Sequence, residues 1–248
     1  MTVDLGLLIL TAASIGFIHT LLGPDHYVPF VAMGAARRWS TRKTLWITSL
    51  CGVGHVLGSV AIGVVGIGIG VSLHKLEWLE GVRGDAAAWL LTGFGLAYLA
   101  WGLKKAWRAR PHTHAHVHGD GLFHEHKHDH EGPHLHPHVP LRPHAHPHVD
   151  AGAARSITPW ALFVIFVLGP CEPLIPVLMY PASQHSVWGT VAVVLAFGAA
   201  TIATMLGVVY LACRGLKRLP LDTAERYSHA LAGAALSLCG LGIVFLGL

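Results

Sequence analysis

Residues 19–26 read His19-Thr20-Leu21-Leu22-Gly23-Pro24-Asp25-His26, and they interrupt an apolar run that extends from Leu5 to about Ala36. An ionisable side chain at membrane depth costs about 2.5–3.5 kcal/mol and usually marks an ion or substrate path. Pro24 lacks a backbone N–H and clashes with the preceding helical turn, and the glycine before it loosens the chain. The stretch therefore predicts a transmembrane helix that breaks where its polar groups are.

The side chains of this stretch suit a metal site. Two imidazoles and a carboxylate form a donor set that divalent zinc, nickel, cobalt or iron prefers. Many transporters build ion sites from broken helices whose freed carbonyls and side chains face a cavity. His19, Asp25 and His26 are therefore candidate metal ligands. The alternative is a kinked helix end whose polar groups satisfy one another, and the grouping of three such residues around Gly-Pro favours the metal site.

The composition is that of a multi-pass membrane protein. Of the 248 residues, 53% are hydrophobic and 12% are charged, whereas soluble domains carry about 25% charged residues. The net charge of +4 is modest and does not indicate nucleic-acid binding. No CxxC motif is present, so a disulfide framework is not expected. The four cysteines stand singly in apolar surroundings: Cys51, Cys171, Cys213 and Cys239.

Six apolar stretches reach the length of about 20 residues that one crossing requires. They cover roughly residues 5–23 (continuing past the break to 36), 44–73, 86–103, 157–181, 187–213 and 228–248. Fifteen of the 17 lysines and arginines fall in the first, third and fifth connections. By the positive-inside rule these connections are cytoplasmic. We therefore expect a protein of the cell (inner) membrane with both termini outside.

The third connection, residues 104–156, is rich in histidine. Fourteen histidines lie between Pro111 and Asp150, many of them at alternate positions. Frequent prolines exclude a continuous helix, and the segment has almost nothing to bury, so we expect it to be disordered. Such tracts bind metals, and binding weakens below about pH 6.5. A neutral spacer of biased composition is the alternative.

The second half of the chain resembles the first. Gly169-Pro170-Cys171-Glu172 stands in the fourth span as Gly23-Pro24-Asp25-His26 stands in the first, and a leucine precedes both. The same offset of 146 residues pairs Gly52 with Gly198. Three spans per copy give copies of opposite orientation, as in secondary transporters. The predicted fold is all-α, with inverted three-helix repeats at residues 1–103 and 157–248 and the loop 104–156 between them. Chance matches among common residues are the alternative.

Three further residues are candidate metal ligands. Glu172 is the other carboxylate expected deep in a span, and with Asp25 it would offset a divalent charge. His55 lies on a glycine-rich span, where backbones approach closely. It is either a ligand or a group that supports one. Cys171 offers sulfur, although a small buried residue is the commoner role for cysteine.

The motif Gly16-Phe-Ile-His19-Thr-Leu-Leu-Gly-Pro-Asp25-His26 resembles the leading motif of the UreH-like branch of the nickel/cobalt transporter superfamily (NicO and NiCoT). The resemblance implies that His19, Asp25 and His26 bind metal on the transport path. The histidine-rich connection is similar to that of nickel/cobalt efflux members. Two features differ from NiCoT permeases. Five residues rather than four separate His19 from the Asp-His pair, and Gly-Pro-Cys-Glu-Pro replaces their Asp-Thr-Ala-Thr-Glu signature.

The segment Leu-Gly-Pro170-Cys171-Glu-Pro also resembles the Pro-Cys signature of the CcdA/DsbD transmembrane thiol reductants. Those proteins need one cysteine in each repeat, so that a disulfide can form and be exchanged. The matching position of the first repeat holds Asp25. This difference argues against dithiol chemistry in the present chain.

The sequence thus predicts a transporter rather than an enzyme. Its substrate is a divalent metal ion, nickel or cobalt first and zinc as a further candidate, and no tightly bound cofactor is expected. Efflux is favoured over uptake, because the histidine-rich loop could gather ions on the cytoplasmic side. A thiol–disulfide electron conduit and a metal-insertion factor of the urease-accessory kind remain as alternatives. The expected partners are metal ions and the lipid bilayer, and a homo-oligomer is left open.

Overall fold

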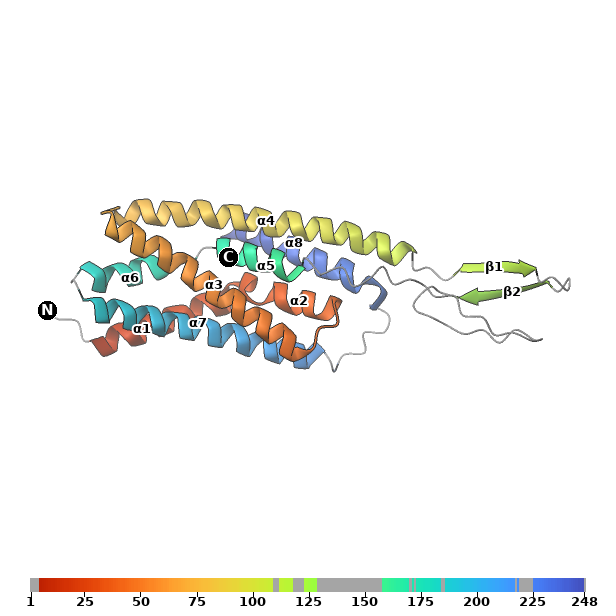
Figure 1. Ribbon diagram of the computed structural model, residues 1–248, viewed down its shortest axis with the longest axis horizontal. Helices are drawn as coiled ribbons and strands as arrows, with labels where there is room; N and C mark the ends of the chain where they lie inside the picture. The colour runs from red at the N-terminus through yellow and green to blue at the C-terminus, as the bar shows by residue number, and fades with distance from the viewer. Residues whose placement is uncertain are drawn as a thin grey trace.

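A computed structural model describes residues 5–108, 112–117, 123–128, 158–169, 171, 173–183, 186–216, 218 and 225–247 (Figure 1). In chain order the helices are α1 (Leu5–Leu22), α2 (Val28–Ala36), α3 (Thr41–Gly68), α4 (Leu73–Arg108), α5 (Thr158–Leu168), α6 (Leu174–Ser183), α7 (Val187–Leu216) and α8 (Ser228–Leu246). Two short 3-10 helices are η1 (Pro24–His26) and η2 (Glu225–Tyr227).

Five of the described helices are long and apolar enough to cross a bilayer, namely α1, α3, α4, α7 and α8. The candidate spans among the described residues are therefore all helical, as in a multi-pass membrane protein. The stretch predicted as a single fourth span is divided into α5 and α6, each too short to cross alone. Gly169 and Pro173 lie between them, and proline cannot continue a helical hydrogen-bond ladder.

The predicted break in the first span is confirmed. α1 ends at Leu22, and η1 separates it from α2. The backbone turns on short-range bonds, from the His26 nitrogen to the Gly23 oxygen (3.2 Å) and from the Tyr27 nitrogen to the Pro24 oxygen (3.3 Å). These bonds close tighter rings than an α-helix does, so the chain passes the proline without losing all of its backbone partners.

α4 is longer than its sequence predicts. The third span was expected at residues 86–103, but the helix runs from Leu73 to Arg108. Residues 74–85 form the expected connection between the second and third apolar stretches, and they carry charges. Two of those charges, Glu80 and Arg83, form an ion pair one helical turn apart, with 3.0 Å between Oε1 and Nη1. Pairing of this kind stabilises a helix across a polar stretch.

The two broken segments run in opposite directions along the bundle. In Figure 1, α1 and α2 follow one another along the long axis, and α5 and α6 do the same in reverse. α1 packs on α7, and α5 packs on α3. The two breaks therefore face each other near the middle of the bundle.

The three basic connections lie at one end of the molecule. α2, α4 and α7 all end there, and the two strands project from the same end (Figure 1). These strands, β1 (His112–Val117) and β2 (Phe123–His128), form an antiparallel hairpin in which His112 pairs with His128. This differs from the expectation of disorder. The physical reason is that prolines flank residues 112–128 and do not interrupt them. Residues 129–157 lie outside the described part of the chain.

α4 and α8 pack along their lengths through glycines. An added Cβ at Gly95 would lie 2.5 Å from the backbone nitrogen of Ser237, and one at Gly102 would overlap the backbone of Ala230. Small residues allow such close contact between membrane helices, where dispersion and not the hydrophobic effect holds helices together.

Replacing Gly102 with alanine should therefore destabilise the protein. Overpacking of this kind costs about 1–3 kcal/mol, so we expect the midpoint of thermal unfolding in detergent to fall by several degrees. The measurement heats purified, monodisperse protein and follows the loss of the monodisperse peak in size-exclusion chromatography. Gly93→Ala is the matched control on the same helix, because nothing lies within 4 Å of its Cβ position. An unchanged midpoint for Gly102→Ala would contradict the close contact.

Candidate metal centre

Three histidines from separate elements meet beside the first break. His19 lies in the last turn of α1, His26 in η1, and His55 in the middle of α3. One ring nitrogen from each lies within 4.8 Å of the others. The His26 ring stands between the other two, with ring centroids 4.8 Å from His19 and 5.1 Å from His55. We call these residues the histidine triad.

Hydrogen bonds fix the orientation of two of these rings. His26 Nδ1 lies 2.9 Å from Asp25 Oδ1, and His55 Nδ1 lies 3.3 Å from the carbonyl oxygen of Phe166. Carboxylate and carbonyl oxygens only accept, so each Nδ1 carries the proton. The lone pair of each ring is then on Nε2. This is how metal-binding histidines are usually oriented.

The Nε2 atoms of the triad have no hydrogen-bond partner among the described residues. All three are buried, and only 1% of His26 and of His55 is exposed. A buried polar atom without a partner is rare and calls for an explanation. A metal ion at the centre would supply the missing interaction. Metal–nitrogen distances of about 2.0–2.1 Å correspond to nitrogens roughly 3.3 Å apart in a tetrahedral site. The rings would have to approach one another to bind an ion, because one nitrogen of each now lies within 4.8 Å of the others.

Asp25 contacts the triad from outside. Its carboxylate bonds to His26 Nδ1, and its side chain is one-quarter exposed. In this position it orients His26 and places a carboxylate beside the three imidazoles. Direct ligation by Asp25 remains a prediction.

The triad opens into a cavity of about 720 Å³. Its wall includes Asp25 and, from α4, a second carboxylate, Asp85. Ile243 and Val244 of α8 close another side. The cavity therefore gives water or an incoming ligand access to the positions that three histidines leave open on a metal ion.

Two helix C-termini point at the triad. α1 ends at Leu22, three residues after His19, and α5 ends at Leu168, two residues after the Phe166 carbonyl that holds His55. Each helix end carries about half a negative charge, so two opposed ends favour a cation between them. Half-helices of transporters use their C-terminal ends in this way.

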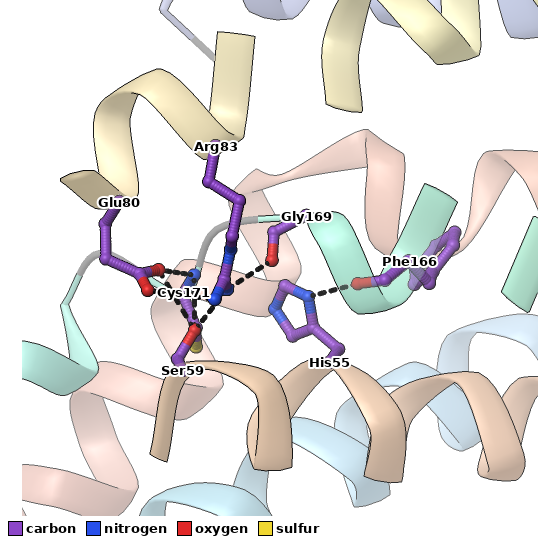
Figure 2. Close-up of polar contacts among 7 residues, drawn as sticks. All are labelled: His55, Ser59, Glu80, Arg83, Phe166, Gly169 and Cys171. Atoms are coloured by element: carbon purple, nitrogen blue, oxygen red, sulfur yellow. Dashed lines mark hydrogen bonds and ion pairs between the residues drawn. The ribbon is translucent and has the colours of Figure 1, made fainter. Parts of the chain in front are cut away.

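A buried ion pair lies beside the second break (Figure 2). Glu80 is fully buried and accepts a hydrogen bond of 3.0 Å from the Ser59 hydroxyl. Arg83 lies 2.6 Å from that hydroxyl through Nη2, which also donates to the Gly169 carbonyl at 2.7 Å. The backbone N–H of Cys171 donates to Glu80 Oε2 at 3.2 Å. This group of residues joins α3 and α4 to the break.

Sequence reasoning missed Glu80, Arg83 and Asp85. These residues lie between the apolar stretches 44–73 and 86–103, which predict a connection there. The signal that could have found them is the Glu-x-x-Arg spacing, which continues the helical register of the apolar residues that follow. Their helical placement brings a carboxylate and an ion pair to the cavity side of the bundle.

The two remaining predicted ligands are not part of the described triad. Cys171 is buried, and the structure gives it contacts to Ser59 and Glu80 through its backbone nitrogen. Glu172 lies outside the described residues. Ligation by either residue stays a prediction.

Comparison with known proteins returned no family model, no curated protein and no solved structure that matches this chain. What the structure itself defines is a multi-pass α-helical membrane protein with a group of three histidines that could hold a metal ion, of which His26 and His55 are buried and His19 is half-buried.

Replacing Asp25 with asparagine should weaken metal binding, because the amide can present its N–H₂ to His26 and favour the wrong tautomer. Loss of such an orienting group typically costs 10- to 100-fold in affinity. The measurement is a cobalt titration of the purified chain. The part of the cobalt binding that His26→Ala abolishes is assigned to the triad, and the remaining binding, which includes that of the histidine-rich loop, is subtracted. Asp85→Asn removes the same charge from the same cavity and serves as the control. Equal effects of both substitutions would contradict an orienting role.

Proposed function

We propose that the protein is a secondary transporter of divalent transition metal ions. The observation that carries the proposal is the set of three buried Nε2 atoms without partners, two of them on rings whose Nδ1 atoms are already bonded. Neutral imidazole is a common ligand for nickel, cobalt and zinc. Nickel and cobalt are favoured by the resemblance of residues 16–26 to the NicO and NiCoT motif.

The pattern of helix contacts supports six crossings built as two inverted repeats. α5 and α6 together would form the fourth crossing in chain order, which adds one to the five long helices. The contact of α1 with α7 has its counterpart in that of α5 with α3. Likewise α2 packs on α8 as α6 packs on α4, and α2 contacts α7 as α6 contacts α3. Rocking of one repeat against the other would expose the triad to each side in turn.

A three-histidine site suits an ion that must leave again. Three neutral ligands leave positions open, and a structural site would close them with further protein ligands. Asp25, which bonds to His26, and the two helix ends offset part of the ion's charge. Binding can therefore be favourable without being permanent, which conduction requires.

The direction of transport is proposed from the charge pattern. Basic residues and the histidine hairpin lie at one end of the bundle, and we assign this end to the cytoplasm of a cell (inner) membrane. α1 would then begin at the outer end, and α8 would run toward the outside from the cytoplasmic end. Ions collected by the hairpin would be delivered from the cytoplasmic side, which favours efflux of nickel or cobalt.

Transport is tested by nickel flux into proteoliposomes, with cobalt and zinc as competitors. We expect flux with the intact chain and its loss in His26→Ala, because that substitution removes the central ligand. Cys171→Ser separates this proposal from the thiol–disulfide conduit, in which Cys171 would be essential and His26 would not. The opposite pattern, loss in Cys171→Ser alone, would indicate the thiol–disulfide conduit.

Deletion of residues 112–148 separates transport from metal reception. The transporter keeps flux after the deletion, with a reduced rate at low metal concentration. A metal-insertion factor would show no flux even as the intact chain, and all its metal binding would disappear with the loop. That second result would contradict the proposal.

A further inference from the structure

We infer that Glu80 and Arg83 are positioning residues of the metal site, acting on His55 through the backbone of the second break. The inference rests on the proposal that the histidine triad binds a divalent metal ion. Among the described residues, no hydrogen bond or ion pair joins either residue to the triad. Their ion pair lies on α4, whereas His55 lies on α3, and the end of α5 joins the two (Figure 2).

The two charges of the ion pair are arranged to suit the backbone groups that the second break leaves free. A broken helix leaves carbonyl oxygens free at the end of its first half and N–H groups free at the start of its second half. Arg83 donates to the Gly169 carbonyl, which follows the last turn of α5. Glu80 accepts from the Cys171 nitrogen, which precedes α6. Each charge therefore faces the backbone group of opposite polarity.

The end of α5 carries this restraint to the metal site. The Gly169 nitrogen donates to the Phe166 carbonyl at 3.1 Å, and the same oxygen accepts from His55 Nδ1 at 3.3 Å. Gly169 is also close to the ring itself, since an added Cβ would lie 3.4 Å from His55 Nδ1. A shift of Gly169 would thus displace the acceptor that sets the orientation of His55.

A plain structural role for the ion pair makes a different prediction. A buried pair that only joins helices depends on the attraction between its charges, and exchange of the two residues would preserve that attraction. A pair that positions the break depends on which charge faces which backbone group. Exchange would place a carboxylate against the Gly169 carbonyl and a guanidinium against the Cys171 N–H.

The experiment is a cobalt titration of the full-length purified chain, followed by the visible absorption of the bound ion, which reports its coordination. The component that His26→Ala abolishes is taken as the triad site. We expect Arg83→Gln to lower the affinity of this component by about 10- to 100-fold, the usual effect of losing a group that orients a ligand. The absorption of the residual complex should change, because His55 no longer holds its orientation.

Two further variants address folding and polarity. Glu80→Gln/Arg83→Gln removes both charges together, so that no unpaired charge stays buried, and it should also weaken binding. The exchange Glu80→Arg/Arg83→Glu keeps an ion pair and should fail to restore the affinity. Arg37→Gln is the matched control, because Arg37 bonds to Thr158 at the other end of α5 with 2.8 Å between Nη2 and Oγ1. It should leave the cobalt spectrum unchanged.

Wild-type cobalt affinity and spectrum in monodisperse Arg83→Gln, or in the double glutamine variant, would overturn the inference. So would recovery of both in the charge exchange. Failure of the proposed function looks different, because the intact chain would then show no cobalt component that depends on His26.

Discussion

Inside a bilayer no water is available to bond a backbone N–H or C=O group, and each group left without a partner costs several kcal/mol. Two helix breaks in the fold have backbone groups that need such partners, one at η1 and one between α5 and α6. Both breaks release backbone groups in the interior of the bundle. The polar side chains of the protein's centre lie where these groups are, which is why the ion pair and the histidine triad are close neighbours.

The two breaks meet the constraint in different ways. At the first, the chain bonds to itself through Gly23 and Pro24, and His26 adds its Nδ1 to the Gly23 carbonyl and to Asp25. At the second, a neighbouring helix supplies the ion pair of Glu80 and Arg83. Among the described residues, the Gly169 carbonyl and the Cys171 N–H of the second break are bonded to this ion pair, whereas His26 Nε2 at the first break has no partner. Under the proposed function, the second break would support the metal site and the first would form part of it.

The sequence predicted the breaks and the histidines well, because Gly-Pro within an apolar run has few structural outcomes. It also placed His55 among the candidates, and α3 brings that residue to the other two. The ion pair could not be predicted in the same way. Charges usually mark connections, and only tertiary packing shows that Glu80 is enclosed between Ser59 and Cys171.

α4 is longer than the hydrocarbon core of a bilayer is thick. Its 36 residues extend about 54 Å, while the hydrocarbon core of a bilayer is about 30 Å thick. Even a tilted α4 must continue beyond the lipid tails, and its last turns carry Lys104, Lys105 and Arg108. The chain that follows α4 therefore begins outside the hydrocarbon core. Under the proposed function, a metal ion bound by the histidine hairpin would be held outside the lipid and would reach the helices through water.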